Sequence, residues 1–267
     1  MAKRTSREQI LFDVRRAHPG LAHELTQGPT EEQLGVIRKG LFRVKRRGFN
    51  EKWIGALTHD LLQAKALSPE HLPEFMSNVG NIADSGQDPT LHTAVVTSSL
   101  LTGAIRPHHV SNFFSLVQDT FGAINQQGNS YTPVATELVQ AFAKRKIRYE
   151  HLQLILPFIT HVAARGENPL RPTQRLLTAV VERRISTAHL AALLDQIRTL
   201  STPAPSKGVW RKITSLWPFQ SNRSPSKLVD HAVRALKTVP PAQVITRQKR
   251  IHTAGLFPTS TRLKRGS

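Results

Sequence analysis

Leucine or isoleucine recurs through the middle of the chain at intervals of 38, 42 and 38 residues, at Leu67, Ile105, Ile147 and Ile185. A histidine follows each of them four residues later, at His71, His109, His151 and His189. A period of this length restricts the chain to a small set of repeat architectures. Each copy holds two helix-length segments joined by a short turn, which predicts a helical hairpin repeated along the chain.

The second segment of each copy has apolar residues at i, i+3, i+4 and i+7, the spacing of one helix face. These sets are Leu72, Phe75, Met76, Val79; Val110, Phe113, Phe114, Val117; Leu152, Ile155, Leu156, Ile159; and Leu190, Leu193, Leu194, Ile197. A degenerate upstream copy has Leu34, Ile37, Arg38 and Leu41, with Gln33 in the histidine column. A glycine closes each second helix, at Gly48, Gly86, Gly128 and Gly166. We therefore expect an all-α fold, an α-solenoid of four to five helical-hairpin repeats with an extended basic C-terminal tail.

The turn into each second helix has capping chemistry. In Leu67-Ser68-Pro69-Glu70-His71, serine is the expected N-cap and proline the first helical residue. The histidine then stands at the third helical position, from which its side chain can reach back to the cap. The alternative is a histidine column that binds metal or transfers protons. Helices stack about 8–10 Å apart, too far for successive histidines to share one ion at about 2 Å, so we favour capping.

Charge is distributed unevenly along the 267 residues, which contain no cysteine and carry a formal net charge of +19. Residues 1–50 hold 11 Lys/Arg against 5 Asp/Glu, residues 51–200 hold 13 against 12, and residues 201–267 hold 13 against 1. The repeats are thus nearly neutral and both ends are basic. The expected partner is a polyanion, either nucleic acid or an anionic membrane surface.

Three regions follow from these patterns. Residues 1–28 are expected to form a basic N-terminal helix. Its cations resemble those of a mitochondrial presequence, but Glu8 and Asp13 are atypical of one. Residues 29–200 form the helical-hairpin repeat domain. Residues 201–267 contain a linker, capping helices and a basic extension: Val209 to Trp217 are expected to cap the last repeat or to stack on bases, and 226–237 to form a short helix.

Cations gather at three kinds of place that we expect to contact RNA. They are the end of the helix before Gly48, the C-terminal region 201–267, and the column just before each repeat anchor, which reads Lys65, Gly103, Arg145 and Arg183. In a stacked array that column becomes one stripe, although dipole complementarity at helix ends would also explain it. The predicted RNA-binding residues are Arg43, Lys45, Arg46, Arg47, Arg145, Lys146, Arg148, Arg183, Arg184, Arg211, Lys212, Arg247, Lys249, Arg250, Arg262, Lys264 and Arg265.

Signals of catalysis are missing from the sequence. His23-Glu24-Leu25-Thr26-Gln27 begins like a zinc-protease motif but has glutamine where the second histidine belongs. We found no Walker loop, dinucleotide-binding glycine motif or nucleophile elbow. We therefore expect no enzyme activity, cofactor, metal or small-molecule substrate. The sequence also has no apolar run of about 18 residues, so we expect no transmembrane segment.

A 38-residue helical hairpin whose second helix opens with Leu-Ser-Pro-x-x-Leu, as at 67–72, resembles the octotricopeptide and heptatricopeptide repeats of organellar RNA-binding proteins. The basic tail is similar to those of ribosomal proteins. These resemblances imply a non-catalytic structural subunit of a large ribonucleoprotein, a mitochondrial ribosome, that contacts rRNA or another structured RNA and neighbouring proteins. The alternatives are a protein-binding scaffold or effector with a membrane-touching tail, a free organellar RNA maturation factor, and a location in another organelle or the cytoplasm.

Overall fold

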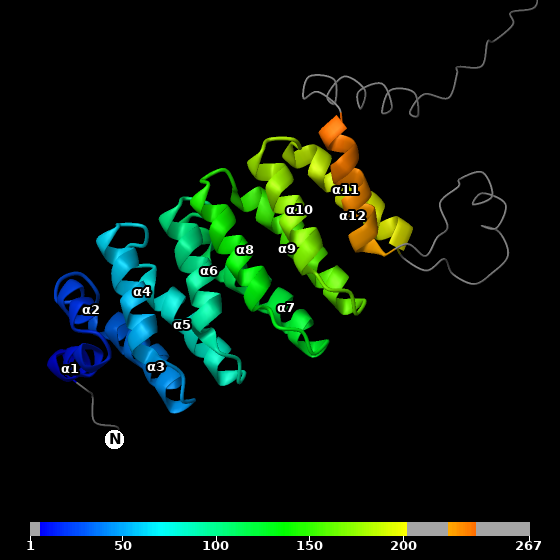
Figure 1. Cartoon of the computed structure of the whole chain (residues 1–267). Helices are drawn as coiled ribbons and strands as arrows, with labels where there is room; N and C mark the ends of the chain where they lie inside the picture. Colours follow the sequence, from blue (N-terminus) through cyan, green and yellow to red (C-terminus); the bar gives the residue numbers. More distant parts are fainter. Residues whose placement is uncertain (1–5, 202–223, 239–267) are drawn as a thin grey trace, which may run out of the picture.

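The computed structural model describes residues 6–201 and 224–238, and this part of the chain is helical without strands (Figure 1). The expected all-α class is confirmed. The helices are α1 (Arg7–Ala17), α2 (Pro19–Glu24), α3 (Glu31–Arg46), α4 (Glu51–Gln63), α5 (Leu72–Asp84), α6 (Pro89–Leu101), α7 (Val110–Gln126), α8 (Thr132–Ala143), α9 (Tyr149–Ala164), α10 (Leu170–Val181), α11 (Thr187–Ser201) and α12 (Pro225–Thr238). A 3-10 turn, η1 (Pro107–His109), precedes α7.

The helices lie in two rows, because each packs on the second helix along the chain. The odd-numbered row runs from α1 to α11, and the even-numbered row runs from α2 to α12 (Figure 1). The turns at 64–71, 102–109, 144–148 and 182–186 lie along one edge of this array, which we call the hairpin edge. The connections at 47–50, 85–88, 127–131 and 165–169 lie along the opposite edge, which we call the loop edge.

The periodic apolar residues form the core. Every apolar member of the five sets is buried except Leu193, which is partly buried. One continuous hydrophobic cluster extends from Ile10 in α1 to Val233 in α12. The expected boundary between residues 28 and 29 falls inside this core, where α1 packs on α3 and α2 on α4. The N-terminal helices thus extend the same two rows.

Left-handed residues end the helices on both edges. On the loop edge these are the predicted glycines, Gly48, Gly86, Gly128 and Gly166, with φ between 71° and 80°. On the hairpin edge they are Lys65 (φ 54°), Gly103 (φ 73°), Arg145 (φ 53°) and Arg183 (φ 56°). The column that the sequence marks as a cation stripe is therefore the position just after each first helix, where glycine is the usual residue.

The capping prediction is correct for α9 and α11 and wrong for α5 and α7, because His109 is the N-cap of α7 and not its third residue. His151 and His189 stand at the third helical position. By contrast α5 begins at Leu72, with His71 itself at the N-cap, because the His71 N–H donates to the Ser68 carbonyl (3.1 Å) and closes a tighter turn first. The reach-back still occurs: the Ser68 hydroxyl and His71 Nδ1 are 2.8 Å apart. In the degenerate copy Gln33 reaches back to the N-cap residue in the same way, and its side-chain oxygen accepts from the Thr30 N–H at 2.8 Å.

Helices α3 and α5 approach unusually closely at two buried glycines. A Cβ on Gly40 would lie 2.5 Å from the Met76 carbonyl oxygen, and one on Gly80 would lie 3.4 Å from the Gly40 Cα. Only glycine leaves room for backbones at this separation. The same close approach brings the end of α3 beside the end of α5, where charged side chains meet.

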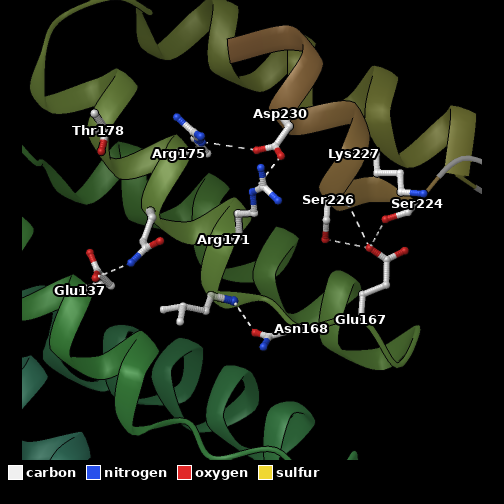
Figure 2. Close-up of a pocket in the computed structure, with 12 residues that line it drawn as sticks. Glu137, Glu167, Asn168, Arg171, Arg175, Thr178, Ser224, Ser226, Lys227 and Asp230 are labelled. Atoms are coloured by element: carbon white, nitrogen blue, oxygen red, sulfur yellow. Dashed lines mark hydrogen bonds and ion pairs between the residues drawn. The ribbon is translucent and has the colours of Figure 1, made fainter. Parts of the chain in front are cut away.

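The helix expected at 226–237 is present as α12, and it covers the end of both rows by packing on α10 and α11. Its N-terminus is held by Glu167, whose Oε2 accepts from the Ser224 hydroxyl (2.6 Å), the Ser226 hydroxyl (2.8 Å) and the Ser226 N–H (3.2 Å) (Figure 2). A carboxylate suits this place because free N–H groups and the helix dipole are both positive there. The expected cap at Val209 to Trp217 lies outside the described residues.

Candidate nucleic-acid interface

Two of the predicted cation clusters meet in one groove on the hairpin edge. The groove has a volume of about 650 Å³ and lies between the turn joining α8 to α9 and the turn joining α10 to α11. Its cations are Arg145, Lys146, Arg148, Arg183 and Arg184, against a single lining acid, Glu150. We call this the basic groove. The sequence predicted that these five residues share an edge, and the packing of α8 on α10 brings them together.

Most cations of the basic groove have no internal partner. Arg184 pairs with Glu182. Arg145, Lys146, Arg148 and Arg183 are exposed, and they form no ion pair with any residue in the described part of the chain. Four unpaired cations on one concave surface produce a positive potential that attracts an anion.

Arg145 and Arg183 hold the left-handed conformation at some cost. This backbone conformation costs about 1–2 kcal/mol more for an L-residue with a side chain than for glycine. A cation at a helix C-terminus recovers about 0.3–1 kcal/mol from the dipole when exposed. Dipole complementarity therefore offsets only part of the cost, and the equivalent turn after α6 uses glycine, Gly103.

Two histidines of the repeat column, His151 and His189, line the basic groove and make structural contacts there. Nδ1 of His151 accepts from the Arg148 N–H (3.1 Å), so a neutral ring carries its proton on Nε2, 3.1 Å from the Thr187 hydroxyl of the next hairpin. Burial lowers the pKa of His151. His109 stacks on the Tyr149 ring with centroids 3.9 Å apart. In the described ranges, no three His, Cys, Asp or Glu side chains are grouped to hold a metal ion.

The predicted cluster at the end of α3 lies on the loop edge, so the structure does not join it to the basic groove (Figure 1). Most of its charge is paired. Arg43 contacts Asp84 (3.3 Å) and Asn81 (3.0 Å), Arg47 contacts the Asp84 carboxylate (3.8 Å) and carbonyl (3.0 Å), and Lys45 contacts Glu51 (3.6 Å). Arg46 is the one cation of these four that forms no ion pair with residues 6–201 or 224–238. We call these four residues the α3 cluster.

The remaining predicted cations are divided between two places. Lys65 is exposed on the hairpin edge, separated from the basic groove by the turn that contains Gly103. Eight residues lie outside the described ranges: Arg211, Lys212, Arg247, Lys249, Arg250, Arg262, Lys264 and Arg265.

Another hollow, of about 870 Å³, lies between α10 and α12, and its charged side chains have partners within the chain for the most part (Figure 2). Asp230 pairs with Arg171 (2.9 Å) and Arg175 (3.4 Å), and Gln174 donates to Glu137 (2.7 Å). Glu167 is occupied by the α12 N-terminus, as described above. These contacts attach α12 to the array. The lining holds three acids and three cations, so the hollow has no net charge to attract an ion; they are Glu137, Glu167, Asp230, Arg171, Arg175 and Lys227.

Sequence reasoning missed the carboxylates that neutralise cations. Asp84 and Asp230 stand far along the chain from their arginines, and nothing local marks them as partners. The available signal was the repeat period, since Arg43 and Asn81 are 38 residues apart and neighbouring units place such residues side by side.

No helix in the part of the chain that the structure describes is long and apolar enough to cross a membrane. Comparison with models of known protein families, with curated proteins and with solved structures gives no match to this chain.

Proposed function

We propose that this chain is a non-catalytic RNA-binding protein with an α-solenoid body, acting as a structural subunit of a large ribonucleoprotein such as a mitochondrial ribosome. The observation that supports the proposal best is the basic groove, where four unpaired cations converge. Two of them, Arg145 and Arg183, occupy left-handed positions that glycine would fill at lower cost. A phosphate backbone following the hairpin edge would neutralise these charges.

The alternating helix contacts support the solenoid part of the proposal. A stack in which each unit touches only its neighbours exposes long edges, and such edges suit extended partners. In this proposal the near-neutral faces of the repeats contact neighbouring proteins, while the basic groove and the basic segment 239–267 contact RNA.

The test is RNA binding of the full chain and of a chain ending at Thr238, each measured over a salt series with a structured RNA. The shorter chain keeps α12 over the apolar end of α10 and α11 and removes only the basic extension. Both are expected to bind with a negative slope of log K against log salt, steeper for the full chain. If neither binds RNA while the full chain binds anionic vesicles, the membrane-touching scaffold is the better reading.

A further inference from the structure

Large apolar side chains are exposed at three described positions, and two of these lie at the N-terminal end of the array. Phe12 in α1 is 54 % exposed and Phe42 in α3 is 61 % exposed; the third is Leu101 in α6. Helices α1 and α3 pack on each other. Two phenylalanine rings on adjacent helices are therefore exposed to water and contribute little to the core.

Phe42 borders a hollow between α1 and α3. The hollow has a volume of about 260 Å³, and its polar lining includes Asp13, Arg16, Arg38, Lys45 and Glu51. Pockets for drug-sized ligands are roughly 300–1,000 Å³, so this space suits a single ring system. Arg38 is fixed beside the ring by a 2.6 Å ion pair with Asp13.

Unpaired cations surround the two rings. On α3, Lys39 and Arg46 stand three residues before and four after Phe42, the spacing of neighbours on a helix surface. On α1, Arg15 and Arg16 stand three and four residues after Phe12. All four are exposed and form no ion pair inside the described ranges, unlike most of the α3 cluster.

We propose that α1 and α3 form a binding site for an unpaired nucleotide of single-stranded RNA, with its base stacked on Phe42 and its flanking phosphates on Arg16, Lys39 and Arg46. Aromatic faces bind any base by stacking, and cations beside them hold the backbone. This inference rests on the proposed function and adds the form of RNA that is bound.

The chemistry of the hollow favours RNA over an anionic membrane. Asp13 and Glu51 at the hollow are paired with Arg38 and Lys45, so little of the hollow's own charge is left for a layer of anionic headgroups. A nucleobase is neutral, and its edge carries both donors and acceptors, so carboxylates and guanidinium groups can both bond to it. The mixed lining around an exposed aromatic ring therefore fits a base.

The experiment measures binding of the full chain to a fluorescent single-stranded oligouridylate, to a blunt RNA duplex and to phosphatidylserine vesicles. Phe42→Ala is expected to weaken single-strand binding roughly tenfold or more and to leave duplex binding within about twofold, because stacking needs an unpaired base. Phe42→Trp is expected to retain single-strand binding. Leu101→Ala removes an exposed apolar side chain far along the array and is the matched control.

Four outcomes would overturn the inference. Equal loss of single-strand and duplex binding in Phe42→Ala would show that the ring supports the fold or a phosphate contact only. Unchanged single-strand binding in Phe42→Ala, with RNA still bound, would remove this site and leave the proposed function standing. Failure of the full chain to bind either RNA would remove both, and loss of vesicle binding alone would assign the site to a membrane.

Discussion

The α3 cluster and the basic groove are both rich in cations, and they differ in what faces them. At the end of α3, Asp84 and Glu51 lie within ion-pair distance of three of the four cations. At the basic groove, one carboxylate, that of Glu182, takes one cation of five. Charge density along the sequence is similar in the two places, yet only the groove keeps most of its charge for a partner.

The difference arises from helix packing. Gly40 and Gly80 let α3 and α5 approach closely enough for Arg43 to reach Asn81 and Asp84. The turns at the basic groove instead place cation beside cation, because the repeat sets Arg145 and Arg183 in the same position of successive units. Packing thus neutralises one cluster and concentrates the other.

The largest expected effect is a loss of folding stability at acid pH, which arises from a buried histidine that belongs to neither cation cluster. His92 is fully buried, its Nδ1–H donates to the Asp88 carbonyl, and its Nε2 has no partner in the described structure. Burial lowers the pKa of His92 to about 4. Its stabilising contribution is therefore full above the unfolded pKa of about 6.5 and is lost as pH falls toward 4, amounting to about 2 kcal/mol between about pH 7 and pH 4.5.

Urea unfolding of the wild type and of His92→Phe at several pH values measures this contribution. The variant is expected to show a flatter dependence of stability on pH. Arginine stays charged throughout this range, so any loss of RNA binding at acid pH should follow unfolding rather than precede it. A wild-type chain whose stability is constant down to pH 4.5 would contradict the role assigned to His92.

The next effect comes from a substitution that separates α3 from α5 and so disrupts the ion pairs of the α3 cluster. Gly40→Ala places a Cβ 2.5 Å from the Met76 carbonyl oxygen, so α3 and α5 must separate. We expect a loss of about 1–3 kcal/mol in the free energy of unfolding, as for other overpacked cores. Gly35→Ala in the same helix is the control: nothing lies within 4 Å of its Cβ, so it should stabilise by about 0.5–1 kcal/mol. Equal effects of the two substitutions would show that the close approach is absent.

The smallest expected effect comes from a substitution that frees cations of the α3 cluster, so that they become unpaired like those of the basic groove. Asp84→Asn removes the carboxylate shared by Arg43 and Arg47. Because the pairs are exposed, stability should fall by less than about 1 kcal/mol. RNA affinity at low salt should rise by roughly twofold or more as two cations become available. Unchanged affinity would mean that the α3 cluster does not contact RNA even when its charge is free.

The periodic features were predictable because they depend on side-chain spacing alone. The buried sets, the terminal glycines and the capping role of His151 and His189 all follow from the repeat. The start of α5 did not, since the choice between an α turn and a tighter turn at Ser68 depends on small differences in hydrogen bonding. Lys65, Arg145 and Arg183 were found as cations, but a left-handed conformation is not expected of residues with long side chains.

The availability of charge was less predictable, because it depends on pairs between separate helices. Sequence alone ranked Arg43 to Arg47 with the basic groove, and only the α3–α5 contact distinguishes them. It also gave no weight to Phe42, whose position among cations three and four residues away was legible in the sequence. The exposure of Phe42 stands out only once the structure shows that neighbouring apolar residues of α3 are buried.

The most direct test of the central claim is the salt dependence of RNA binding for the double substitution Arg145→Gly and Arg183→Gly in the full chain. At each site glycine relieves a left-handed cost of about 1–2 kcal/mol and forfeits about 0.3–1 kcal/mol of dipole stabilisation, so stability should be equal to or above that of the wild type. The slope of log K against log salt should become shallower by about 1.4–1.8, the value for two phosphate contacts, with little change for Arg43→Ala and Arg47→Ala together. A folded double glycine variant with the wild-type slope would contradict the account.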